Sequence, residues 1–183
     1  MAFPDTSVNE RWGTPQNLFD ILNQEFRFGL DAAADLTNHK CLFYIGPNSS
    51  LGEDALAADH WASSSKALNQ ARTVWCNPPY TKSGGGILPW MKRGRATAQA
   101  GAICVMLIYA RTDTKAWQDI VHPFADEVRL IEGRLKFEPP GDYTGKATTA
   151  GAPSAIVIFR PETAHLGRIG GAQYRTWKYQ DNG

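Results

Sequence analysis

Residue types and segments that mark secreted, metal-binding or membrane proteins are scarce in this 183-residue sequence. Cys41, Cys76 and Cys104 are odd in number, widely spaced and without a Cys-x-x-Cys pair, which argues against a disulfide framework or a zinc site. The histidines, at positions 39, 60, 122 and 165, show no metal-ligand spacing. No apolar segment approaches the length of a membrane span, and the N-terminal residues do not form a signal peptide. We therefore expect a protein of a reducing cytoplasm, with no metal and no membrane partner.

The sequence also lacks a strong excess of charge and the usual phosphate-binding loops. Its formal net charge is +1, and its hydrophobic (43%) and charged (20%) contents are ordinary for one globular domain. The glycine-rich stretch 81–86 does not have the residue order of a P-loop, and no Gly-x-Gly-x-x-Gly fingerprint is present. The local basic cluster Lys82, Lys92, Arg93 and Arg95 can bind phosphates, or can equally be the solvated face of a helix.

The most informative stretch is Thr-Val-Trp-Cys-Asn-Pro-Pro-Tyr, residues 73–80. Its first four residues favour a short buried strand, which must end at Asn77 because Pro78 and Pro79 lack backbone donors. Pro78 also keeps Asn77 out of the helical region, so a carboxamide, backbone carbonyls and the ring of Tyr80 project where the strand ends. Such a group can accept both hydrogens of an exocyclic amine while the ring stacks on the base. The plainer alternative is an ordinary proline-rich turn.

Two other stretches place carboxylates where a ligand could bind. Asp31 ends a predicted strand and is followed by small alanines, which is where doubly wound folds bind cofactors, although such an aspartate is often only a helix cap. Asp59 lies close to Trp61, a pair that could hold an adenine, or a cap beside a core tryptophan. Thr14-Pro15 predicts the start of a helix over about 15–25, whose free N–H groups could bind a carboxylate.

The order of the predicted elements indicates the fold class. We expect strands at 26–31, 41–45, 73–76, 102–109, 127–132 and 155–159, with helices over 15–25, 87–100 and 115–121. This alternation predicts a mainly parallel α/β sheet with an antiparallel hairpin at its C-terminal edge. We expect a flexible arm at 1–13, one domain at 14–161 and a surface tail at 162–183. The long loop 133–153 suggests a functional role.

Seven segments, in order, make the chain similar to a known family. The run from Trp12 to Pro161 resembles the small S-adenosylmethionine-dependent DNA N6-adenine methyltransferases of bacteriophages and prophages. The matching segments are Trp12-Gly-Thr-Pro15, Leu30-Asp-Ala-Ala-Ala34, Leu56-Ala-Ala-Asp-His-Trp61, Asn77-Pro-Pro-Tyr80, Ala110-Arg-Thr-Asp-Thr114, Gly133-Arg-Leu-Lys-Phe137 and Ser154-Ala-Ile-Val-Ile-Phe159. His60 departs from the pattern because the family often has the aspartate and tryptophan adjacent.

The resemblance implies a doubly wound, mainly parallel α/β methyltransferase sheet of the Rossmann-like type with seven strands. It also implies a site-specific adenine methyltransferase of the bacterial host cytoplasm, and methyl transfer to a flipped-out adenine in DNA. The implied catalytic residues are Asn77, Pro78, Pro79 and Tyr80. The residues implied to bind S-adenosylmethionine are Trp12, Thr14, Pro15, Asp31, Ala32, Ala33, Asp54, Asp59, Trp61 and Asn77, with Glu53 as an alternative to Asp54 at the ribose. The candidate DNA contacts are Lys82, Arg111, Thr112, Arg134 and Lys136.

Three alternatives stay open from the residues alone. The same chemistry could act on another amine or amide, such as cytosine N4 or a protein glutamine. The chain could be a DNA-binding relative that has lost catalysis, or an ordinary α/β domain in which the tetrapeptide is a turn. The recognition sequence, the choice between duplex and single strand, and the oligomeric state are not readable from the sequence.

Overall fold

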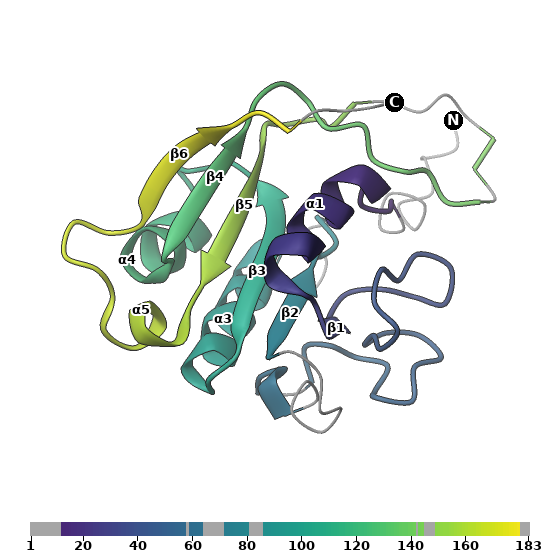
Figure 1. The fold of residues 1–183 in the computed structure, drawn as a ribbon, viewed down its shortest axis with the longest axis horizontal. Coiled ribbons are helices and arrows are strands. Elements are labelled where there is room, and N and C mark those ends of the chain that lie inside the picture. Colours follow the sequence, from purple (N-terminus) through teal and green to yellow (C-terminus); the bar gives the residue numbers. More distant parts are fainter. Residues whose placement is uncertain are drawn as a thin grey trace.

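The computed structural model describes residues 12–57, 59–63, 72–80, 86–141, 143–144 and 149–179. The strands are β1 (Leu30–Asp31), β2 (Thr73–Cys76), β3 (Ile103–Tyr109), β4 (Glu127–Ile131), β5 (Ser154–Phe159) and β6 (Gln173–Trp177). The helices are α1 (Gln16–Phe26), α3 (Ile87–Gln99), α4 (His122–Phe124) and α5 (Pro161–Leu166), with a π-helical turn, η3, at Trp117–Val121. Figure 1 shows these elements along the chain.

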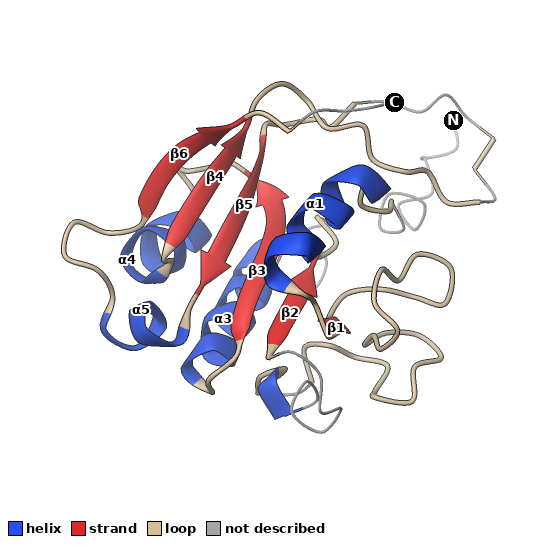
Figure 2. Ribbon diagram, in the orientation of Figure 1, coloured by secondary structure: helices blue, strands red, loops and turns tan. Residues whose placement is uncertain are grey.

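The strands form one mixed sheet in the order β1-β2-β3-β5-β4-β6 (Figure 2). β1, β2 and β3 run parallel, and β4 and β6 are parallel to each other. β5 is antiparallel to both of its neighbours, β3 and β4. Because β5 reverses direction between them, β3 and β4 run the same way, and the C-terminal ends of β1, β2, β3 and β4 meet at one edge of the sheet.

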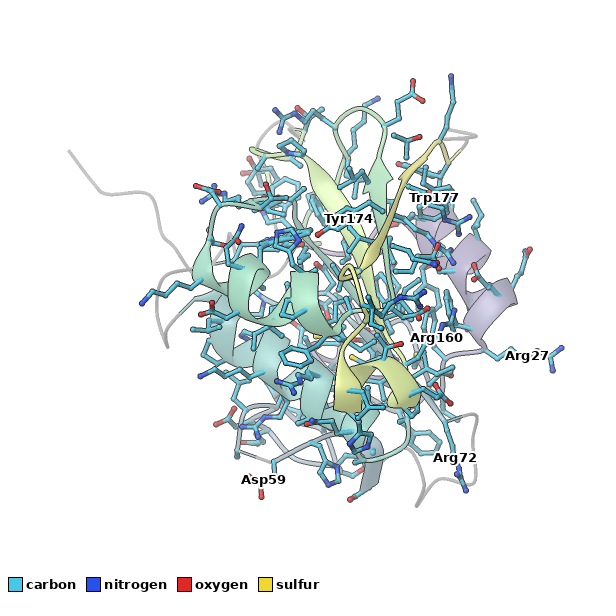
Figure 3. All side chains as sticks on the ribbon, turned by 90° about the vertical axis from the view of Figure 1, so that its left-hand side faces the viewer. Arg27, Asp59, Arg72, Arg160, Tyr174 and Trp177 are labelled. Carbon is cyan, nitrogen blue, oxygen red and sulfur yellow. The ribbon has the colours of Figure 1, made fainter. Side chains whose placement is uncertain are left out.

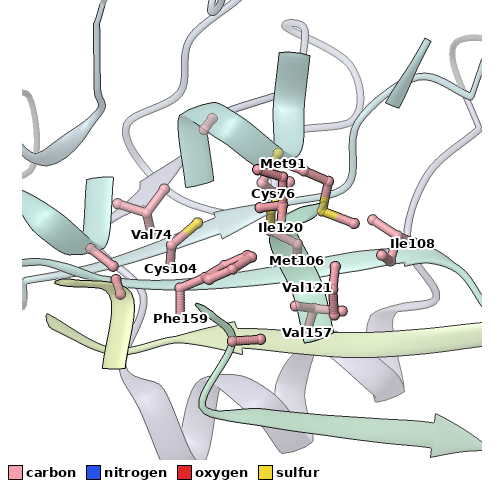
Figure 4. Packing of buried hydrophobic residues seen from close by; sticks show 14 of the residues in the cluster. Val74, Cys76, Met91, Cys104, Met106, Ile108, Ile120, Val121, Val157 and Phe159 are labelled. Atoms are coloured by element: carbon pink, nitrogen blue, oxygen red, sulfur yellow. The ribbon is translucent and has the colours of Figure 1, made fainter. Parts of the chain in front are cut away.

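Helices cover both faces of the sheet, which gives three layers (Figure 3). On one face α1 buries its apolar stripe against Trp75 of β2 and Val105 of β3. On the other face Met91 of α3 and Val121 of η3 pack against Met106 and Val157 (Figure 4). Gly94 allows α3 to lie close to the sheet, because a Cβ there would stand 2.5 Å from the Met106 sulfur. The predicted α/β class, a mostly parallel sheet packed between helices, is thus confirmed.

The prediction that a hairpin of the last two strands forms the edge of the sheet is wrong. β4 and β5 do pair antiparallel, but β5 lies inside the sheet between β3 and β4, and β6 forms the edge. Every residue of β5 is buried, as is typical of a strand covered on both faces. The described residues form six strands, whereas seven were expected.

The expected strand over 41–45 is reduced to one isolated bridge between Tyr44 and Asp31. The chain leaves β1 through a turn in which Asp35 Oδ1 accepts from the N–H groups of Thr37 (2.7 Å) and Asn38 (3.2 Å). Aspartate favours such local turns over a continued ladder. The predicted strand over 26–31 is likewise confined to Leu30–Asp31.

The segment expected as a surface tail, 162–183, contains α5 and β6. β6 pairs with β4 over five residue positions, from Gln173 opposite Glu127 to Trp177 opposite Ile131. An ion pair fixes β4, the strand that β6 pairs with, to α1. The guanidinium of Arg129, only 3% exposed, donates to both carboxylate oxygens of Glu25 at 2.6 Å and to Glu127 at 2.9 Å.

Candidate functional site

Polar residues gather at the edge where the parallel strands end. Asp31 is the last residue of β1, Asn77 directly follows β2, and Tyr109 ends β3. Such an edge is where open α/β sheets bind their ligands. The strand assignment for 73–76, and the placement of Asn77 just beyond it, are confirmed.

Asp31 and Asn77 line the same small cavity of about 30 Å³. Its other walls come from Trp12, Thr14 and Ala33, which were all predicted to bind the cofactor, and from Gly13, Asn38, Trp75 and Pro79. Trp12 and Asn77, which are 65 positions apart in sequence, therefore meet at one cavity. Asn38 was missed by the sequence analysis, because the turn after Asp35 brings it back to the strand ends.

The Asp31 carboxylate is buried, with 3% of the residue exposed. Oδ2 accepts from the Lys40 backbone N–H at 3.1 Å, and Oδ1 accepts from the Ala33 N–H at 3.3 Å. Burial raises the pKa of this carboxyl from its ordinary 3.8 to about 6, although the two backbone donors and the nearby Lys40 charge work in the opposite direction. Asp31 is thus a carboxylate that would gain from a cationic ligand.

The Asn77 amide is oriented by two neighbours. Its Nδ2 donates to the Trp12 carbonyl at 3.5 Å, and its Oδ1 lies 3.1 Å from the Tyr80 hydroxyl. The same hydroxyl lies 2.9 Å from the Leu107 carbonyl, and its single proton serves one of these two acceptors at a time. An amide oxygen has two lone pairs, so Asn77 Oδ1 keeps the capacity to accept from an amine.

Tyr80 is placed differently from the open stacking surface that we expected. Its ring stacks on Tyr109 with 4.0 Å between ring centroids and an interplanar angle of 17°. The ring of Phe137 lies edge-to-face with it, with 6.2 Å between the ring centroids. Burial raises the pKa of the Tyr80 hydroxyl well above its usual range, so the group stays neutral. One of the two faces of Tyr80 is therefore covered by a side chain of this protein.

A larger cavity of about 310 Å³ adjoins the small one, since Ala33, Asn38 and Pro79 line both. Asp54, predicted to bind the cofactor, and Glu53, the alternative, both line it. Its remaining walls are Ala34, Asp35, Ile45, Gly46, Pro47, Ala55 and Trp90. Trp90 was missed because helical spacing in α3 does not tell which of its apolar residues faces a cavity and which faces the core.

Asp59 and Trp61, predicted to hold an adenine, line neither cavity. The side chain of Asp59 is fully exposed and lies 3.8 Å from Arg93, and Figure 3 shows it projecting from the body of the molecule. Trp61 is buried in the core, where its indole N–H donates to the Ala55 carbonyl at 2.9 Å. Trp61 instead packs behind the cavity-lining Trp90, with 6.2 Å between ring centroids.

The start of α1 also differs from the prediction. The helix begins at Gln16, and Pro15 is a buried N-cap without a side-chain cap bond. The Gln16 N–H is not free for a ligand carboxylate, because it donates to Glu138 Oε1 at 2.8 Å. Ala32 lies in the core and lines neither cavity. Of the pair Thr14-Pro15, Thr14 lines the small cavity.

Four of the five candidate DNA contacts lie at the same edge as Asn77. Arg111 and Thr112 follow β3, Arg134 and Lys136 follow β4, and all four are exposed. Arg111 stands over the ring of Tyr109 at 5.6 Å. Within the described residues, none of the three cations pairs with a carboxylate. Lys82 lies outside the described residues.

The described part of the chain contains no cluster of three or more His, Cys, Asp or Glu side chains suited to a metal ion. None of its helices is long and apolar enough to cross a membrane. The three cysteines are buried free thiols. Burial raises the pKa of the Cys76 and Cys104 thiols, which lie in the core.

Comparison with known proteins agrees with this geometry. The family model described as DNA N-6-adenine-methyltransferase (Dam) matches residues 4–180. No curated protein matches the chain. The match covers nearly the whole sequence, so the chain belongs to the DNA N-6-adenine-methyltransferase family.

Proposed function

We propose that this protein transfers the methyl group of S-adenosylmethionine to the exocyclic N6 amine of adenine in DNA. The observation that carries the proposal is that Asn77 and Asp31 line one small cavity. An amine held by the Asn77 amide would then stand beside a cofactor held by Asp31. Family membership supports the substrate class.

The residues present fit the cofactor. The buried Asp31 carboxylate, held by backbone N–H groups alone, suits the ammonium group of the methionine end. The adjoining cavity of about 310 Å³ suits the adenosine end, because ligand sites of this kind measure about 300–1,000 Å³. Glu53 or Asp54 would accept from the ribose hydroxyls. Trp90 would contact the adenine ring, in place of the Asp59 and Trp61 that were expected there.

The cofactor supplies an electrophilic methyl group on a sulfonium. Adenine N6 is a weak nucleophile, since its lone pair is delocalised into the ring. Asn77 Oδ1 and the Pro78 carbonyl, by accepting the two N6 hydrogens, would favour a pyramidal nitrogen with a localised lone pair. A bound cofactor would supply the methyl carbon to N6 and keep the electrons of the broken S–C bond, and N6 would lose a proton to solvent. The protein's part is positioning and charge stabilisation.

An adenine within a duplex cannot reach this site while stacked, so we propose that the nucleotide flips out, at a cost of a few kcal/mol. Tyr80 would stack on the flipped base through a face that Tyr109 does not cover. Stacking of this kind recovers about 1–3 kcal/mol per base. Arg111, Thr112, Arg134 and Lys136 would contact phosphates along the same edge.

A label-transfer experiment tests the proposal. The purified protein is incubated with tritiated-methyl S-adenosylmethionine and unmethylated bacterial DNA, and the DNA is digested to nucleosides. We expect label in N6-methyldeoxyadenosine, with none above background for the Asn77→Ala control. Label in N4-methyldeoxycytidine or in added protein would instead identify another amine or amide as the acceptor. Cofactor binding without any label would identify an inactive DNA-binding relative.

A further inference from the structure

Residues 134–138, which follow β4, connect the exposed cations to the cofactor end of the site. Leu135 and Phe137 are buried, whereas Arg134 and Lys136 are exposed, so alternate residues point to opposite sides. Glu138 then pairs with Gly13 through two backbone hydrogen bonds of 2.8 and 2.9 Å. This pairing holds Gly13 in place, and Gly13 is one of the residues that line the small cavity.

The Glu138 side chain makes a second connection. Oε1 accepts from the Gln16 backbone N–H at 2.8 Å, and Oε2 accepts from the Lys40 ammonium at 2.7 Å. That ammonium also donates to the Gln16 side-chain oxygen at 2.9 Å. The Lys40 side chain is 9% exposed. The Glu138 side chain is 44% exposed, so water reaches the carboxylate of this ion pair, whereas the ammonium is largely desolvated.

Lys40 in turn contacts Asp31. Its backbone N–H donates to Asp31 Oδ2 at 3.1 Å. The hydrogen bond from the Ala33 N–H to Oδ1 of the same carboxylate is longer, at 3.3 Å. A chain of contacts thus runs from Glu138 through the Lys40 side chain to the Lys40 backbone and the cavity-lining Asp31. Removing the Glu138 charge would take away the ion-pair partner of the Lys40 ammonium, which would still donate to the Gln16 side-chain oxygen.

We propose that Glu138 is a positioning residue for the cofactor, which holds Lys40 and the Gly13 segment so that Asp31 keeps its place in the cavity. This inference rests on the proposed function. A Lys40 ammonium without Glu138 turns toward solvent and draws its backbone N–H away from Asp31. The cofactor site then loses affinity although every residue lining the cavity is unchanged.

The test is calorimetric binding of S-adenosylhomocysteine, the unreactive product of the cofactor. Glu138→Gln keeps the shape and the acceptor for the Gln16 N–H but removes the charge. We expect its Kd to rise between about tenfold and a hundredfold, the range in which misplacement of a site by a distant change falls. Glu132→Gln is the matched control, because it removes the same charge from an exposed pair with Lys178 at 3.8 Å. Its Kd should equal that of the wild type.

Two further measurements separate positioning from a loss of folding. Kinetics on DNA should show a raised KM for S-adenosylmethionine and an unchanged kcat for Glu138→Gln, whereas a partly unfolded variant would lose kcat. Lys40→Met should weaken binding as well, and the double variant should be no worse than Lys40→Met alone, because both changes break one chain of contacts.

A Kd for Glu138→Gln within twofold of the wild type, in a folded protein, would overturn the inference. Fully additive losses in the double variant would overturn it too, since the two residues would then act separately. If the wild-type protein itself fails to bind S-adenosylhomocysteine, the proposed function falls, and this inference falls with it.

Discussion

Replacing Asp31 with asparagine should change how the stability of the fold depends on pH. Burial raises the pKa of Asp31 from 3.8 to about 6, so between these values the folded protein binds more protons than the unfolded chain. Its free energy of unfolding therefore falls as pH rises through this window. A rise in pKa from 3.8 to about 6 corresponds to about 3 kcal/mol at neutral pH. Asparagine does not titrate, so this contribution is absent from Asp31→Asn.

The assay is urea unfolding of both proteins across pH 3.5 to 7, followed by tryptophan fluorescence. The free energy of unfolding of Asp31→Asn minus that of the wild type should become more positive by about 3 kcal/mol over this range. Other carboxyls that titrate in the same range cancel in the difference. Asparagine also loses one acceptor for the Lys40 N–H, but this cost is a constant offset and leaves the slope unchanged.

Cofactor binding gives the opposite ranking of the two proteins. The ammonium of S-adenosylhomocysteine needs an ionised Asp31, so wild-type affinity should fall about tenfold per pH unit below pH 6. Asp31→Asn should bind S-adenosylhomocysteine weakly at every pH. Its free energy of unfolding nevertheless gains on that of the wild type as the pH rises. A stability difference that stays within about 1 kcal/mol across the range would refute the reasoning, because Asp31 would then not be desolvated.

Four other predictions test separate parts of the structure. Asn77→Asp should abolish turnover with the fold retained, because a carboxylate places charge beside the reacting amine; methylation within tenfold of wild type would remove Asn77 from its role. Gly46→Ala should abolish S-adenosylhomocysteine binding by calorimetry, since φ is +149° there and the new Cβ would stand 1.8 Å from the Ala34 carbonyl. Tyr109→Ala should lower kcat/KM for DNA about tenfold while the Kd for S-adenosylhomocysteine stays constant, as Tyr80 loses its stacking partner; a change in that Kd alone would contradict this. Glu25→Gln should lower the free energy of unfolding in urea by about 1.5–3 kcal/mol through the lost charge-assisted bonds to Arg129, and no change would show that Glu127 suffices.

The parts of the site that depend on neighbouring residues in the chain were predictable from the sequence. The β-forming residues of 73–76 and the two prolines after them act within a few positions, so the strand and its end at Asn77 were predictable. Asp31 was predictable for the same reason, as a carboxylate at the end of an apolar strand followed by small residues. Both observations depend on neighbours in the chain and not on the rest of the fold.

Tertiary placement decided what the sequence did not show. β6 has four exposed residues of five and no apolar alternation, and it is a strand only because β4 offers a partner. The fully apolar run of β5 did contain a signal for an interior strand, yet adjacency to β4 in sequence suggested an edge hairpin. Asp59 and Trp61 have suitable chemistry, but Trp61 finds its hydrogen-bond acceptor in the core at Ala55.

Asp31 and Arg129 show how structure separates a functional charge from a structural one. Each residue is 3% exposed. The Arg129 guanidinium is matched by Glu25 and Glu127, and their hydrogen bonds raise its pKa despite the opposing effect of burial. Asp31 forms no ion pair within the described residues and is held by two backbone N–H groups. A buried carboxylate without an ion-pair partner destabilises a fold, because burial disfavours its charged form. A residue that weakens the free protein but faces a cavity beside Asn77 is best explained by a cationic ligand that completes it.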